Sequence, residues 1–130
     1  MSTETHQRVL KALLIGTGLI FIFGIGILMR VWPAGFAWSP GQNEYELMFV
    51  GVYATLGVFL LIASRAPEKH RSLILFTAWS SIVHAAIMAV QAIVDEAERG
   101  HLVGDVPALA LVGIVLLVLN PAAETQGSSV

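Results

Sequence analysis

Four long stretches without any Asp, Glu, Lys or Arg constrain the fold of this chain more than any other feature. They contain 18, 18, 23 and 18 residues and cover positions 12–29, 47–64, 72–94 and 106–123. A helix that crosses a lipid bilayer needs about 20 mostly apolar residues. The stretches therefore predict an all-α chain with four transmembrane helices, and they argue against an ordinary soluble domain.

Turn residues and flanking charges divide the chain into one membrane domain and two tails. We expect helices over residues 9–31, 44–64, 72–94 and 105–120. They would form an antiparallel four-helix transmembrane bundle over residues 9–121, with a Pro- and Gly-rich loop at 32–43. Residues 1–8 and 122–130 are expected to be disordered tails. The first helix is expected to be retained rather than cleaved as a signal peptide, because its apolar core exceeds the usual length of about 7–15 residues.

Lysine and arginine fall mainly on one side of the predicted bundle. The side that holds both termini and the connection between the second and third helices carries Arg8, Lys11, Arg65, Lys69 and Arg71. The opposite side carries only Arg30 and Arg99. Because cytoplasmic flanks of transmembrane helices carry the excess of positive charge, we expect both termini to be cytoplasmic and the outer face to be acidic.

Composition narrows the range of possible activities. The formal net charge is −2 and the sequence pI is about 6.0, so the chain lacks the basic surface of a nucleic-acid-binding protein. It contains no cysteine, which excludes disulfides and thiolate metal sites. Four passes through the lipid bilayer leave no room for a separate soluble domain. The sequence also contains no glycine-rich phosphate loop and no serine elbow, and it argues weakly against an enzyme.

Polar side chains form a stripe on the third predicted helix. Its members, separated by three or four residues, are Thr77, Ser81, His84, Met88, Gln91 and Asp95. This spacing places all of them on one face of an α-helix. Because a polar face in contact with lipid would be costly, we expect the stripe to point into the bundle.

Glycines in the first two helices predict close packing. The first helix contains Gly16, Gly18, Gly24 and Gly26, and the second contains Gly51 and Gly57. Small residues let transmembrane helices approach one another closely. The alternative is that the glycines of the first helix line a path for a substrate.

The hairpin between the second and third helices predicts which residues share a depth in the membrane. If its turn is centred on Glu68, Tyr53 lies beside His84 near the middle of the bilayer. Glu46 then lies beside Gln91, nearer the outer face. The fourth helix adds the carboxylate of Asp105 at the outer rim. The candidate ligand-binding residues are Glu46, Tyr53, Ser81, His84, Gln91 and Asp105.

Several of these residues also have a purely structural interpretation. His84 would accept a proton or anchor a polar head group inside the membrane, or it would be a neutral histidine bonded to Tyr53 or Ser81. Glu46 and Asp105 would each stabilise the N-terminal end of a helix instead of a ligand, the latter as an N-cap. The sequence leaves both interpretations open.

The histidines do not predict a metal or haem centre. Haem ligation by two histidines would need a symmetric dimer, because only His84 is embedded. A zinc site from His84, His101, Glu46 and Asp105 lacks any tight ligand spacing. His70 and His101 lie in predicted loops and are given no role beyond a weak contribution to the rim. We therefore predict no metal and no cofactor.

Three functions are compatible with these features. In the leading hypothesis, the second to fourth helices form an outward-opening pocket for a lipid-like molecule, such as a quinone or an isoprenoid. His84 and Tyr53 would meet its polar group, while Glu46, Gln91 and Asp105 would form the mouth. One alternative is a structural or accessory subunit of a larger membrane-protein complex. Another is a small transporter that acts as a homo-oligomer.

Four sequence blocks carry a resemblance to known proteins. They are YELMFVGVYATLGVFLLIA at 45–63, RAPEKHRS at 65–72, WSSIVHAAIMAVQA at 79–92 and GHLVGDVPAL at 100–109. These blocks resemble an uncharacterised bacterial family of small four-helix integral membrane proteins, labelled only as a domain of unknown function. The resemblance implies a location in the bacterial inner membrane. It implies no activity, no cofactor and no site residue.

Overall fold

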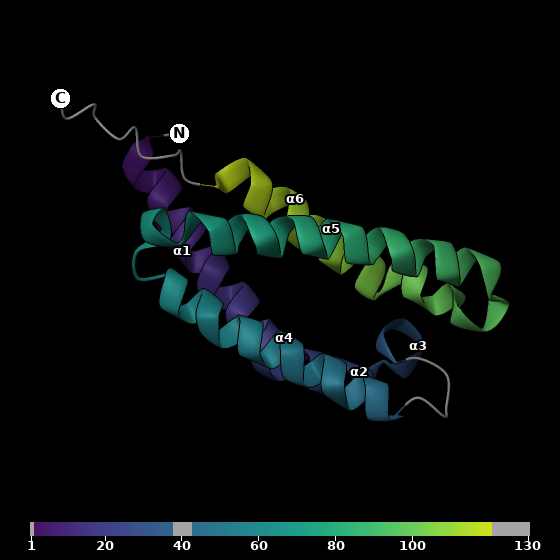
Figure 1. The fold of residues 1–130 in the computed structure, drawn as a ribbon. Helices are drawn as coiled ribbons and strands as arrows, with labels where there is room; N and C mark the ends of the chain where they lie inside the picture. The colour runs from purple at the N-terminus through teal and green to yellow at the C-terminus, as the bar shows by residue number, and fades with distance from the viewer. Residues whose placement is uncertain (1, 38–42, 121–130) are drawn as a thin grey trace.

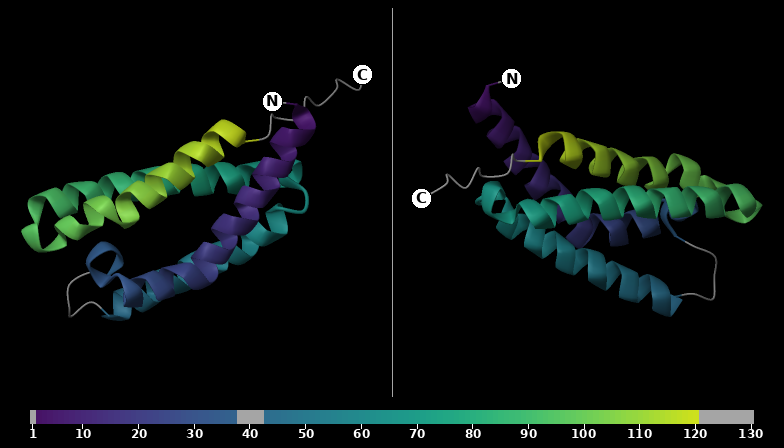
Figure 2. Two further views of the ribbon diagram at one scale, coloured as in Figure 1. Left: turned by 180° about the vertical axis from the view of Figure 1, so that it is seen from behind. Right: turned by 45° about the horizontal axis from the view of Figure 1, so that its top comes forward.

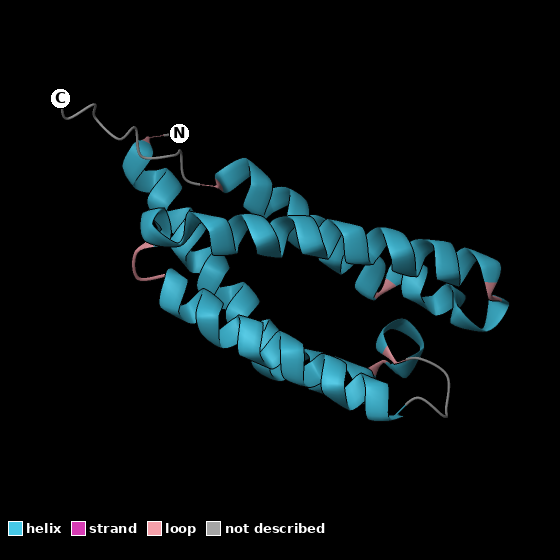
Figure 3. Cartoon of the chain, in the orientation of Figure 1, coloured by secondary structure: helices cyan, strands magenta, loops and turns pink. Residues whose placement is uncertain are grey.

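The computed structural model describes residues 2–37 and 43–120, and every regular element within them is helical (Figure 3). The elements are α1 (Thr3–Leu19), η1 (Ile20–Gly24), α2 (Ile25–Val31), α3 (Pro33–Phe36), α4 (Asn43–Ala63), η2 (Pro67–His70), α5 (Arg71–Val94), η3 (Glu96–Val103) and α6 (Asp105–Leu119). η1 is a π-helix, whereas η2 and η3 are 3-10 helices. The predicted tail at 122–130 lies outside the described residues.

Four continuous helical segments of the described chain are long and apolar enough to cross a membrane. They are Thr3–Val31, Glu44–Ala63, Pro67–Val94 and Glu96–Leu119. The first combines α1, η1 and α2, and the last combines η3 and α6. The prediction of an all-α chain with four such helices is confirmed.

The helix boundaries differ most from the prediction at the N-terminus. The prediction of a disordered tail over residues 1–8 is wrong, because α1 includes all but the first two of them. The Ser2 hydroxyl caps α1 by accepting a hydrogen bond from the Thr5 amide at 3.2 Å. Glu4 and Arg8, one turn apart, form an ion pair at 2.7 Å. Such pairs stabilise an exposed helix modestly.

Two of the predicted connections contain helical turns. Pro33 begins α3, where its fixed φ and missing N–H suit the first helical position. Between α5 and α6, the Asp95 side chain caps η3 by accepting a hydrogen bond from the Ala97 amide at 3.0 Å. The segment after α5 is therefore ordered by local hydrogen bonds rather than being an irregular loop.

The helices form two pairs that meet at one end and separate toward the other (Figure 1). α5 packs along α6, while α4 packs against α1 and η1. α4 and α5 come together at the turn formed by residues 64–70 and diverge away from it, as Figure 2 shows from two further directions. α3 lies at the wide end, between the diverging pairs. Fully buried core residues include Leu14, Leu60, Ile74 and Leu116.

Glycines allow the close contacts within each pair. A Cβ atom added to Gly57 would lie 2.6 Å from the carbonyl oxygen of Gly18, and one added to Gly18 would lie 2.8 Å from that of Gly57. In the other pair, a Cβ atom on Gly113 would lie 2.5 Å from Cγ1 of Ile82. A Cβ atom on Gly51 would meet nothing within 4 Å. Close packing therefore accounts for Gly18 and Gly57, but not for Gly51.

Large apolar side chains are exposed on all four long helices. Examples are Phe23, Val52, Phe76 and Val118, which are 62, 66, 63 and 72% exposed. Soluble monomers rarely expose apolar surface continuously over whole helices. This surface is the kind that lipid tails cover, which agrees with helices that could cross a membrane.

Candidate functional site

A cleft of about 890 Å³ lies between the two helix pairs. Its walls come from α2, α3, α4, α5 and η3, with one residue from the start of α6. They are mainly apolar and include Ile25, Phe49, Val83, Ile87 and Val90. The volume falls in the range of about 300–1,000 Å³ that is usual for small-molecule sites. The fold therefore contains a pocket of suitable size, but its walls differ from the expected second to fourth helices: α2 and α3 take part, and α6 contributes only Asp105.

Tyr53 and His84 meet across the two pairs, as the hairpin geometry predicts. The Tyr53 hydroxyl on α4 lies 2.7 Å from Nδ1 of His84 on α5. His84 lines the cleft, whereas Tyr53 is only 8% exposed and does not line it. Of the two partners considered for a structural histidine, the one that bonds the ring is therefore Tyr53 and not Ser81.

Two aromatic rings hold this pair in place. Phe21, in the π-helical segment η1, packs edge-on against Tyr53 with ring centroids 4.9 Å apart. Phe49, one turn before Tyr53, has its ring centroid 4.5 Å from that of Tyr53 and 4.8 Å from that of His84. Edge-to-face and tilted ring contacts of this kind favour one relative orientation. The imidazole is thus positioned by packing as well as by its hydrogen bond.

The second ring nitrogen of His84 is open to a ligand. In the described part of the chain, the His84 side chain makes one hydrogen bond, between its Nδ1 and the Tyr53 hydroxyl. Since His84 lines the cleft, Nε2 can bond a polar group that enters it. The tautomer decides whether Nε2 donates or accepts.

The remaining predicted residues divide between the cleft and the core. Glu46, Gln91 and Asp105 line the cleft together with His84. Ser81 is 1% exposed and does not line it, whereas its neighbour Ser80 does. The polar stripe of α5 is therefore split, with some members buried in the core and others facing the cleft.

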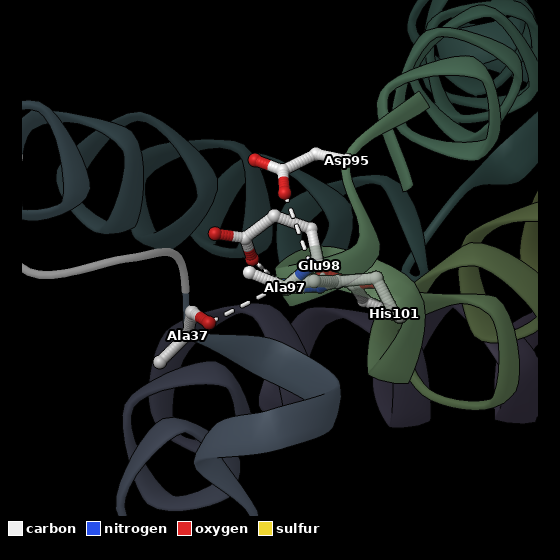
Figure 4. Close-up of polar contacts among 6 residues, drawn as sticks. Ala37, Asp95, Ala97, Glu98 and His101 are labelled. Atoms are coloured by element: carbon white, nitrogen blue, oxygen red, sulfur yellow. Dashed lines mark hydrogen bonds and ion pairs between the residues drawn. The ribbon is translucent and has the colours of Figure 1, made fainter. Parts of the chain in front are cut away.

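A second group of ionisable side chains lies at the wide end of the cleft. His101 is fully buried in η3, and its Nδ1 lies 2.9 and 2.8 Å from the two carboxylate oxygens of Asp105. Its Nε2 lies 3.2 Å from Oε2 of Glu98 and 3.2 Å from the carbonyl oxygen of Ala37 (Figure 4). Glu98 and Asp105 are 5 and 7% exposed, and both line the cleft. We call Glu98, His101 and Asp105 the buried triad.

The contacts of the buried triad constrain its protons. A carbonyl oxygen only accepts hydrogen bonds, so Nε2 of His101 donates to Ala37. Nδ1 faces the Asp105 carboxyl group, so these two groups share one proton. Either the ring is charged and Asp105 is ionised, or both are neutral. In both cases the His101–Asp105 pair has no net charge, and an ionised Glu98 makes the triad negative.

Sequence reasoning missed this triad. The prediction that His101 is a loop residue with only a weak role at the rim is wrong, because its ring is fully buried and bonded on both sides. The prediction of Asp105 as an N-cap is also wrong, because Gly104 occupies that position and the Asp105 side chain bonds His101. Had the segment been treated as helical, the spacing of 98, 101 and 105 would have placed the three residues on one face, but it would not have shown their burial.

Contacts between α3 and η3 bridge the two helix pairs at the wide end (Figure 1). A Cβ atom added to Gly100 would collide with the backbone of Ala34, and one added to Gly104 would collide with that of Gly35. The buried histidine adds its hydrogen bond to Ala37. These close contacts fix one end of the cleft.

The cleft offers a ligand hydrogen-bonding groups, carboxylates and apolar walls. His84 and Gln91 can bond a polar group, and Glu98 and Asp105 can attract a positive one. In the residues that the structure describes, no three His, Cys, Asp or Glu side chains are arranged to hold a metal ion. Binding of an amphipathic molecule is the chemistry that this combination supports most directly.

Comparison with known proteins identifies the family but adds no activity. Neither the curated proteins nor the solved structures yield a match. A family of unknown function matches almost the whole chain, which agrees with the resemblance to uncharacterised proteins. The bacterial origin and the membrane location that this resemblance implies stay predictions. The chain belongs to the family of unknown function DUF6632, which it matches over residues 5–129.

Proposed function

We propose that this chain is an integral protein of the bacterial inner (cytoplasmic) membrane, with four antiparallel transmembrane helices and both termini in the cytoplasm. Four sufficiently long apolar helices and their exposed apolar side chains support the membrane location. The excess of Lys and Arg near the N-terminus and in the 65–71 segment supports the orientation.

The orientation predicts which engineered cysteines an external reagent reaches. The chain has no native cysteine, so Glu68→Cys and Glu96→Cys each provide one thiol at an exposed position. In spheroplasts, a membrane-impermeant maleimide is expected to label Glu96→Cys and to leave Glu68→Cys unlabelled until the membrane is permeabilised. Labelling of Glu68→Cys in intact spheroplasts would reverse the proposed topology.

We further propose that the cleft binds a lipid-like molecule whose polar group bonds His84. The observation that carries this proposal is the cleft itself, of about 890 Å³, with His84 in its wall and no described partner for its Nε2 atom. The cleft lies between helices that could cross a membrane, so a lipid-like molecule would reach it from the bilayer. An ionisable residue within such a helix is a functional candidate by default.

The hydrogen bond with Tyr53 would decide whether Nε2 of His84 donates or accepts a hydrogen bond. If the tyrosine hydroxyl donates to Nδ1, Nε2 carries the proton and can donate to a carbonyl group, as in a quinone. If Nδ1 donates to the hydroxyl, Nε2 accepts and can bond an alcohol, as in an isoprenoid alcohol. The pair is therefore able to bond either kind of polar group without moving its rings.

Lipids that co-purify with the protein test this proposal. We expect mass spectrometry of the protein in mild detergent to find at least one species enriched over bulk lipid. His84→Ala should reduce its retention by about two- to tenfold, the equivalent of one hydrogen bond. His70→Ala, in η2 and outside the cleft, is the matched control and should retain it fully. Equal and unselective lipid content in all three proteins would contradict a specific pocket.

A further inference from the structure

Carboxylates crowd the wide end of the cleft. Glu46, Asp95, Glu98 and Asp105 all line it. The first belongs to the first turn of α4, and the other three lie in or beside η3, so all four are far along the chain from the turn that joins α4 to α5. No Lys or Arg occurs among the described lining residues. The mouth is thus acidic, whereas the deeper walls are apolar.

The negative charge of this end is not balanced by the buried triad. The His101–Asp105 pair carries no net charge in either of its proton arrangements. Ionised Glu98 therefore adds a negative charge at a position only 5% exposed, where charges interact more strongly than in water. An anionic head group would be repelled there, and a cationic one would be attracted.

Aromatic and apolar side chains complete the site. Phe36, Tyr45 and Phe49 also line the cleft, and aromatic faces attract ammonium groups. Along α5, the lining extends from Asp95 to Ser80, which at 1.5 Å per residue spans roughly 22 Å. Apolar side chains fill most of that length, so the wall can accommodate an extended hydrocarbon tail.

We infer that the ligand of the cleft is a cationic amphiphile, with an amine or quaternary ammonium head among the carboxylates and an apolar tail along α5. This inference rests on the proposed function, because it adds a charged group at the mouth to the molecule whose polar group would bond His84 deeper in the same cleft. Beyond the carboxylates, the same cleft continues along α5 between mainly apolar side chains.

Three photoreactive probes with one shared tail test the charge of the head group. Each carries the same dodecyl diazirine tail, and the heads are trimethylammonium, hydroxyl and sulfate. They are added to the full-length protein in phosphatidylcholine nanodiscs, and labelled residues are mapped by mass spectrometry. Labelling at cleft residues of α5 is divided by labelling at Val118, which is exposed on α6 and outside the cleft. This ratio corrects for differences in membrane partition.

We expect the ratio to be about tenfold higher for the ammonium probe than for the sulfate probe, as several partly screened charge interactions would produce. Glu46→Gln should lower this preference by roughly three- to fivefold. Glu44→Gln is the matched control, because it removes the same charge from an exposed position of the same helical turn that does not line the cleft.

Each other outcome overturns a defined part of the proposal. A ratio well above one that is equal for all three heads would overturn the cationic ligand but keep the cleft as a lipid site. A ratio near one for every probe would overturn the lipid site as well. Displacement of the ammonium probe by an equal concentration of tetramethylammonium would show that the tail contributes nothing, and would overturn the amphiphile.

Discussion

His101→Ala should lower the free energy of unfolding by about 3–5 kcal/mol, the usual cost of removing one partner from a buried ion pair. The ring is fully buried, and it bonds Asp105 through one nitrogen and Glu98 and Ala37 through the other. Without it, two carboxyl groups that are at least nine-tenths buried would lose their shared hydrogen-bonding partner. The bridge between α3 and η3 would lose its hydrogen bond as well.

Unfolding by sodium dodecyl sulfate in mixed micelles measures this loss. His70→Ala, which removes the same side chain from a half-buried position in η2, should cost less than about 1 kcal/mol. If the cost at 101 comes from stranded carboxylates, adding Glu98→Gln and Asp105→Asn to His101→Ala should restore part of the lost stability. If His101→Ala lowered the free energy of unfolding no more than His70→Ala does, the contacts of His101 with Glu98 and Asp105 would not stabilise the fold.

The pairing of Tyr53 with His84 could be predicted because it depends on few variables. The turn between α4 and α5 is short, and both helices rise by about 1.5 Å per residue. Counting outward from Glu68 therefore places equal numbers of residues at similar depth. The hydrogen bond of 2.7 Å between the two side chains confirms that count. Their role in binding a ligand stays a prediction.

The buried triad could not be predicted in the same way, because tertiary contacts create it. Glu98, Arg99 and His101 form a polar segment beside Gly100, which is the composition of a solvated linker. Burial of that segment depends on α3, whose backbone packs against Gly100 and Gly104 across a long separation in sequence. Spacing alone gives the shared face of Glu98, His101 and Asp105, but it does not give the element that covers it.

The glycines of α4 show the same limit of sequence-based prediction, because their positions in the sequence do not tell which of them contacts another helix. Gly51 and Gly57 both lie in α4, and the sequence predicts close packing at both. Six residues correspond to about 1.7 turns at 3.6 residues per turn, so the two glycines face different directions. The rotation of α4 about its own axis, set by packing against α1 and η1, decides which glycine meets a neighbour.

Gly57→Ala should therefore destabilise the protein by about 1–3 kcal/mol, the usual cost of overpacking a tight contact. The added methyl group would lie 2.6 Å from the carbonyl oxygen of Gly18 and 2.8 Å from Cγ1 of Ile22. It would also lie 3.1 Å from Cβ of Phe21, the residue whose ring packs against Tyr53. Unfolding in mixed micelles should show the loss, and retention of co-purifying lipid should fall with it.

Gly51→Ala is the matched control, since its methyl group would meet nothing within 4 Å. Alanine favours a helix over glycine by roughly 0.5–1 kcal/mol, so this variant should be neutral or more stable. Gly18→Ala places a methyl group against the same contact from the other side, at 2.8 Å from the carbonyl oxygen of Gly57. Because either methyl group already forces α1 and α4 apart, the double variant should lose less than the sum of the single losses. Fully additive losses, or equal effects at 51 and 57, would mean that α1 and α4 do not meet at Gly18 and Gly57.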